Sequence, residues 1–387
     1  MNTGKYVFAQ LTSFLNKNIF DSFVKKYDGN KYVKHFTCWN QLLCMIFGQL
    51  TGQDSLRDLS LTIDAHSGKS YHLGFGKRVS RSNFAIANER RESKIFEEFA
   101  YFIINIARTK CSSSNFRIKG EIYAFDSSTI DLCLSVFWWA KFRKKKGGIK
   151  LHTLFEITTQ IPVFIHITPA TVNDVNAMGF INYESGAYYV FDRGYVDFKR
   201  LFVITKHSAF FVIRGKKNLK FSRVYSHKVD KSTGLKCDQT IKLTGYYQSQ
   251  YYPEKLRRIK YYDKENKRVF VFLTNNFELT ALDIALLYKN RWQVKLFFKW
   301  IKQHLKVKTF WGYSENAVRI QIYTAIITYC LVAIVGKELK IERSTYEILQ
   351  ILSVSLLDKT LINELFTKID YKDVKEQYDK QLKISFD

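Results

Sequence analysis

Two aspartates, Asp126 and Asp192, each follow a short apolar run in a part of the chain whose pattern predicts β-strands. A carboxylate at a strand end lies at the edge of a sheet, where it can hold a divalent metal ion together with water and phosphate oxygens. Two such ions about 4 Å apart activate an attacking oxygen and stabilise the leaving oxygen in phosphoryl transfer. Taken alone, an Asp after a strand is more often a turn or helix-cap residue.

A cationic stripe is predicted on a helix over residues 288–302. At about 100° per residue, one side of this helix carries Tyr288, Arg291, Lys295, Lys299 and Lys302. The other side is apolar and carries Leu287, Val294, Phe297, Ile301 and Leu305. Arg forks onto a phosphate, Lys adds a point charge and Tyr donates a hydrogen bond, so the stripe suits a nucleic-acid backbone. Without another motif, a solvated basic face is the better explanation.

Three ordered segments resemble motifs of the IS4 family of insertion-sequence transposases. Phe125-Asp126-Ser-Ser-Thr and Phe191-Asp192-Arg-Gly-Tyr195 resemble its two acidic motifs, and the helix at 288–302 resembles its Tyr-x2-Arg-x3-Glu-x6-Lys signature. The resemblance covers most of the chain from about 120 to 335. It implies an RNase-H-like fold that cuts transposon ends and joins them to target DNA. It also implies Mg²⁺ or Mn²⁺ as cofactor, as two ions when all three carboxylates are present.

The resemblance implies a role for each matching residue. Asp126 and Asp192 would be catalytic metal ligands, and Tyr288, Arg291 and Lys302 would bind DNA. Lys299 is a DNA-binding candidate from its place in the cationic stripe alone. Lys295 occupies the position of the catalytic Glu. This replacement changes the local charge by two units and offers no lone pair unless the amine is deprotonated. We therefore expect this chain to bind DNA and to cleave it poorly or not at all.

The whole chain is strongly basic. Its 61 Lys and Arg against 35 Asp and Glu give a net charge of +26, for which a polyanion is the simplest partner. A predicted backbone-phosphate loop contains Arg143, Lys144, Lys145 and Lys146, with a solvated loop as an equally good explanation. No lipid-anchored basic segment or secretion signal is evident, and the apolar stretch at 320–335 is interpreted as a buried helix. We expect a bacterial cytoplasmic, nucleoid-associated protein with no membrane partner.

The predicted fold is α/β, with an RNase-H-like mixed-sheet core, a β-strand insertion, and helical N-terminal and C-terminal parts. Helical spacing predicts a helical domain over 1–112 that could bind DNA ends. The core is expected at 113–216 and 277–336, interrupted by a β-rich insertion at 217–276 and followed by a helical segment at 337–387. Helix starts are predicted at Ser82 and at the Ser344-Thr-Tyr-Glu347 capping box.

Two other functions remain open from the sequence. A catalytically dead copy would bind transposon ends or inhibit active siblings, and a metal-dependent nuclease would cut DNA without joining it. An active transposase must pair two terminal inverted repeats, so a homodimer in the synaptic complex is expected. Gel shifts, cleavage and insertion into a target plasmid distinguish the three.

Overall fold

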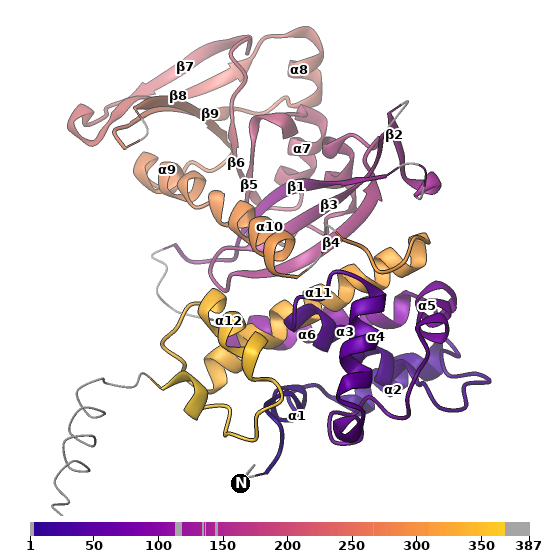
Figure 1. The fold of residues 1–387 in the computed structure, drawn as a ribbon. Helices are drawn as coiled ribbons and strands as arrows, with labels where there is room; N and C mark the ends of the chain where they lie inside the picture. Colours follow the sequence, from indigo (N-terminus) through magenta and orange to yellow (C-terminus); the bar gives the residue numbers. More distant parts are fainter. Residues whose placement is uncertain are drawn as a thin grey trace, which may run out of the picture.

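The computed structural model describes residues 4–112, 118–133, 135, 137–143, 146–265, 267–305, 307 and 309–367. In these residues the chain forms one large mixed sheet with a layer of helices packed beneath it (Figure 1). The α/β fold class, with helices at both ends of the chain, is therefore confirmed.

The centre of the sheet has the strand arrangement of an RNase-H-like fold. Its antiparallel part comprises β1 (Ile122–Leu132), β3 (Lys146–Glu156) and β4 (Ile161–Pro169). Next to β1 follow two strands parallel to it, β5 (Tyr188–Phe191) and β6 (Phe210–Arg214). The strand order β4-β3-β1-β5-β6 is the order expected for this fold. A short strand, β2 (Lys141–Arg143), extends the edge beside β3.

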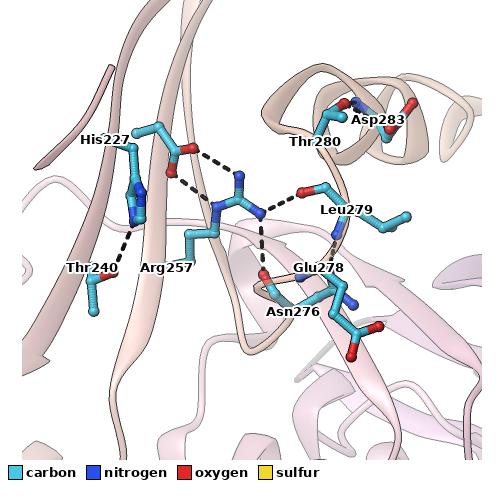
Figure 2. Close-up of polar contacts among 9 residues, drawn as sticks. His227, Thr240, Arg257, Asn276, Glu278, Leu279, Thr280 and Asp283 are labelled. Atoms are coloured by element: carbon cyan, nitrogen blue, oxygen red, sulfur yellow. Dashed lines mark hydrogen bonds and ion pairs between the residues drawn. The ribbon is translucent and has the colours of Figure 1, made fainter. Parts of the chain in front are cut away.

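The β-rich segment after β6 continues the same sheet. It adds β7 (Phe221–His227), β8 (Leu235–Leu243), β9 (Leu256–Asp263) and β10 (Arg268–Thr274), with β10 pairing to β6. A short helix, α8 (Tyr246–Tyr251), joins β8 to β9. Arg257 in β9 forms a buried ion pair with Asp238 in β8. Its Nη1 also donates to the carbonyl of Leu279 at 2.5 Å, which connects this region to the loop before α9 (Figure 2).

Alternation along β1 divides the core between the two faces of the sheet. Tyr123 and Phe125 pack in a cluster with α7 (Phe198–Lys206). Ile122 and Ala124 belong to the larger cluster on the other face. That face is covered by α9 (Ala281–Lys289) and α10 (Trp292–His304), as Figure 1 shows. Short 3-10 turns are η1 (Ser67–Lys69), η2 (Trp138–Ala140), η3 (Asp174–Phe180), η4 (Arg193–Tyr195), η5 (Lys231–Thr233) and η6 (Glu364–Phe366).

The helices from the two ends of the chain form one layer. The N-terminal members are α1 (Val7–Thr12), α2 (Lys17–Lys26), α3 (Cys38–Leu50), α4 (Leu56–Ala65), α5 (Arg81–Arg90) and α6 (Lys94–Cys111). The C-terminal members are α11 (Glu315–Glu338) and α12 (Thr345–Ser355). α11 is long and apolar enough to cross a membrane by length and composition, but 89% of its most apolar stretch is buried in protein. It is the central helix of this layer, as predicted for 320–335.

Two helix starts test the capping predictions. Ser344 and Glu347 form the predicted reciprocal capping box at α12. The predicted start at Ser82 is wrong, because Ser80 caps α5 by accepting from the amide of Asn83 at 3.2 Å. Both serines satisfy the sequence rule for a cap, and only the backbone conformation distinguishes them.

Candidate active site

The pairing of β1 with β5 brings Asp126 and Asp192 side by side. The two strands are parallel, and their last paired residues are Phe125 and Phe191. Each aspartate is the next residue, so both carboxylates lie where this pairing ends. β5 stops there, but β1 continues to Leu132, so the expectation that Asp126 ends its strand is wrong. Pairing with β3 on the other side keeps β1 extended beyond the aspartate.

Arg291 lies between the two carboxylates. Its Nη1 is 3.0 Å from Oδ2 of Asp126, and its Nη2 is 3.5 Å from Oδ2 of Asp192. The hydroxyl of Tyr288 donates to Oδ1 of Asp192 at 3.2 Å, and the guanidinium lies 5.5 Å from the centre of the Tyr288 ring. Arg291 and Tyr288 are buried, with 9% and 8% of their surface exposed. The acidic pair therefore faces a cation and a phenol from the junction of α9 and α10.

The single helix predicted over 288–302 is wrong, because the chain changes helix at this junction. α9 ends at Lys289, and Arg291 is the residue before α10. The amide of Arg291 bonds to the carbonyl of Tyr288 at 3.1 Å, and that of Gln293 to Asn290 at 3.1 Å. These bonds span three residues rather than four and tighten the turn. The predicted apolar side is nevertheless buried at Leu287, Val294, Phe297, Ile301 and Leu305.

The five residues of the predicted cationic stripe point in different directions. Tyr288 and Arg291 turn inward to the carboxylates, whereas Lys295 and Lys299 are exposed. Lys302 is half-buried and donates to the carbonyl of Thr129 in β1 at 2.6 Å. The break at Asn290 rotates the two ends of the stripe away from a common face, so only part of it is available to a ligand in solution.

Lys295 is exposed and lies near enough to the acidic pair for its charge to act on both carboxylates. Its positive charge favours the ionised forms of both Asp126 and Asp192. It also lines the same cavity as Asp192, Tyr288 and Arg291. The site thus contains two carboxylates and two cationic side chains.

No third metal-binding acid completes the site in the described part of the chain. There, no group of three or more His, Cys, Asp or Glu side chains could hold a metal ion. The carboxylate of Asp283 accepts a hydrogen bond from Thr280, the N-cap residue of α9, and Glu315 pairs with Arg319. Two carboxylates with a guanidinium between them do not fit the two-ion site that the family resemblance implies.

The two carboxyl groups respond differently to this environment. Burial raises the pKa of Asp126 above its ordinary value, although Arg291 and the amide of Ser127 oppose that shift. Burial also acts to raise the pKa of Asp192, but Arg291, the amide of Arg193 and the hydroxyl of Tyr288 outweigh it and lower that pKa. Asp192 is therefore the better stabilised anion, because its side chain is 34% exposed and that of Asp126 only 14%, so burial penalises its charge less.

A cavity of about 1310 Å³ opens beside the acidic pair. α9, β9, β10 and the start of α10 line it, and its walls include Asp192, Arg214, Arg268 and Lys295. Trp292, with 50% of its surface exposed, lies at its wall next to Arg291. Sequence reasoning missed Trp292 as a lining residue; its position directly after Arg291 was the available signal.

The predicted phosphate-contact loop falls partly outside the described residues. Lys144 and Lys145 lie there. The backbone of Arg143 ends β2 and pairs with that of Lys146 at the start of β3. Of the four basic residues, the described backbones of Arg143 and Lys146 therefore lie in paired strands at the edge of the sheet.

The chain belongs to a family of DDE transposases. Residues 117–331 match the family described as "Transposase DDE domain", and residues 3–76 match "Domain of unknown function (DUF4372)". The first match spans all of β1 to β10, α9 and α10, and therefore contains Asp126, Asp192 and Lys295.

Its relatives include proteins of insertion sequences, which confirms the resemblance found in the sequence. A Sinorhizobium fredii protein named as a transposase, y4zB, is 38% identical over 65% of this chain and 70% of its own. A Geobacillus stearothermophilus protein named as a transposase for insertion sequence element IS5377 is 29% identical, and the match covers 58% of this chain and 59% of that protein. A Synechocystis protein named as a transposase for insertion sequence element IS4SA is 26% identical, and the match covers 66% of this chain and 72% of that protein. A piggyBac transposase synaptic complex with hairpin DNA covers 95% of this chain and 84% of its own at 11% identity; its TM-score of 0.46 is too low to support an argument.

Proposed function

We propose that this chain is an insertion-sequence transposase that binds transposon-end DNA and whose cut-and-paste activity is weak or absent. The observation that carries the proposal is the convergence of Asp126 and Asp192, with Lys295 lining the same cavity as Asp192. Asp126 and Asp192 support a phosphoryl-transfer site of the DDE family. Lys295 stands at the sequence position where the family signature has its third carboxylate, a Glu.

Charge supports DNA as the partner. The net charge of +26 favours a polyanion, and Lys299 extends an exposed basic surface from Lys295 along α10. Arg143 to Lys146 would add phosphate contacts at the edge of the sheet. Tyr288, Arg291 and Lys302 are proposed DNA contacts by family resemblance, and in the DNA-free chain they bond to Asp192, Asp126 and Thr129.

An active form would use Mg²⁺ or Mn²⁺ at Asp126 and Asp192, with a carboxylate at 295 completing the site. Because the residues present do not fit that arrangement, this chain's own groups can hold DNA but lack a ligand for the reaction. Paired transposon ends would require two copies of the chain, which supports a homodimer in the synaptic complex. The proposal includes a bacterial cytoplasmic, nucleoid-associated location.

The substitution Lys295→Glu tests the proposal. It restores a carboxylate beside Asp126 and Asp192, and donor cleavage with Mg²⁺ or Mn²⁺ should rise on the order of a hundredfold or more. Cleavage is measured on a duplex that carries the element's terminal inverted repeat. Lys299→Glu makes the same charge change one helical turn away and should give no rescue. Strong cleavage by the unsubstituted chain would refute the proposal.

Lys295 also favours a second candidate function. A catalytically dead copy would occupy transposon ends or form mixed dimers with an active sibling. Retention of an end duplex in gel shifts, with no cleavage even after Lys295→Glu, supports this alternative.

A further inference from the structure

The acidic pair already has cations of its own. Arg291 donates from Nη1 to Asp126 at 3.0 Å, and its Nη2 lies 3.5 Å from Asp192. Lys295 adds a second positive charge that both carboxylates feel. Two negative groups are therefore balanced by two positive groups from the same chain. A divalent ion added to this set would leave an excess of positive charge in a largely buried site.

Arg291 lies so close to the two carboxylates, and is so little exposed, that its charge acts on them directly. Its side chain is 11% exposed and that of Asp126 is 14% exposed, so water screens their attraction only weakly. The guanidinium uses its two terminal nitrogens on the two different carboxylates. An ion bridging the same oxygens would have to share that space with a fixed cation.

We infer that Arg291, assisted by Lys295, is the resident counter-ion of Asp126 and Asp192, so the DNA-free chain folds without a divalent ion and binds one only weakly there. This inference deepens the proposed function by naming what neutralises the site before DNA is present. It rests on the proposed function for the role of the site, while the pairing of Arg291 with both carboxylates is observed directly.

Mn²⁺ binding to the full DNA-free chain tests the inference, with the free ion measured by electron paramagnetic resonance. The unsubstituted chain should bind weakly, and Arg291→Gln should bind at least on the order of tenfold more tightly because the carboxylates lose their partner. Adding Asp192→Asn to Arg291→Gln should abolish the gain. Arg319→Gln removes an arginine from its pair with Glu315 on α11 and should leave Mn²⁺ binding unchanged.

A second variant and the melting temperatures keep the inference testable if Arg291→Gln does not fold. Arg291→Lys keeps one charge but cannot span both carboxylates, so it should give an intermediate Mn²⁺ affinity. Mn²⁺ should also raise the melting temperature of Arg291→Gln and not that of the unsubstituted chain. The inference is overturned if the unsubstituted chain binds Mn²⁺ as tightly as Arg291→Gln and loses that binding with Asp192→Asn. It is equally overturned if neither folded Arg291 variant gains affinity.

Gel shifts separate this inference from the proposed function. A chain that fails to bind its end duplex contradicts the proposed function, whatever its Mn²⁺ affinity. Tight Mn²⁺ binding by the unsubstituted chain contradicts the counter-ion inference, even if end binding and rescue by Lys295→Glu are both observed.

Discussion

Two buried arginines pair with carboxylates in this protein, and they do so very differently. Arg257 grips Asp238 with two hydrogen bonds of 2.9 and 2.7 Å, and its remaining nitrogen bonds to backbone carbonyls before α9 (Figure 2). Arg291 is spread across Asp126 and Asp192, and its Nε has no hydrogen-bond partner among the described residues. In the first pair, the side chains of Arg257 and Asp238 are both buried, with 8% and 7% of their surface exposed. In the second, Nη2 of Arg291 is 3.5 Å from Oδ2 of Asp192, and both residues line a cavity.

The difference indicates which pair is fixed by its surroundings and which can more easily exchange its partners. A fully paired buried ion pair fixes one arrangement, since breaking it leaves an uncompensated charge. Asp238 and Arg257 join β8 and β9 to the loop that begins α9, and so help to hold α9 over the sheet. The side chain of Asp192 is 34% exposed, so its contacts can be exchanged for others at smaller cost.

Arg257→Gln should have the largest effect on stability. It leaves Asp238 buried and unpaired, so the free energy of unfolding should fall by about 3–5 kcal/mol. Arg291→Gln should lower it by less, about 1–3 kcal/mol, because water reaches Asp192. Urea unfolding followed by circular dichroism measures both. Equal losses would erase the distinction between the two arginines.

Strands and helices that are marked by apolar runs could be predicted from the sequence. The apolar runs before Asp126 and Asp192 predicted a strand before each aspartate, because hydrophobic periodicity reports burial directly. The buried helix at 320–335 followed from the same signal, whereas the RNase-H-like fold was implied by the family resemblance. The extension of β1 beyond Asp126 did not, because pairing with β3 rather than hydrophobicity holds that polar stretch.

Inward rotation of Arg291 was not predictable from the same pattern. A helical projection assumes an unbroken helix, and the turn at Asn290 has helical backbone angles with no Gly or Pro to mark it. The pairing of Arg257 with Asp238 was also missed. It joins residues in neighbouring strands through a register that the sequence alone does not specify.

A buried histidine in β3, the strand that pairs with β1, extends the comparison to pH. His152 is fully buried, bonds to Thr168 through Nε2 at 2.9 Å, and its Nδ1 has no partner in the described part of the chain. Burial lowers the pKa of His152 to about 4. The unfolded chain takes up the proton near pH 6.5, so stability should fall by roughly 3 kcal/mol as pH drops from about 6.5 to 4.

His152→Gln should remove this part of the pH dependence, measured as the difference in unfolding free energy between the two chains at each pH. His227→Asn is the matched control, because His227 also contacts a threonine, Thr240, from an exposed strand. A difference curve for His152→Gln as flat as that for His227→Asn would show that His152 is not held neutral by burial.

The smallest expected effects separate the two aspartates. Asp192 has a lowered pKa, so its charge stabilises the fold above its unfolded pKa, and this stability is lost as pH falls through the folded value. At pH 7, Asp192→Asn should therefore cost about 1 kcal/mol, a modest figure because the side chain is partly exposed. Asp126 has a raised pKa, so its charge is disfavoured in the fold, and Asp126→Asn should be neutral or slightly stabilising. Urea unfolding at pH 7 should give opposite or clearly unequal shifts, and equal losses would mean that Arg291 holds both carboxylates alike.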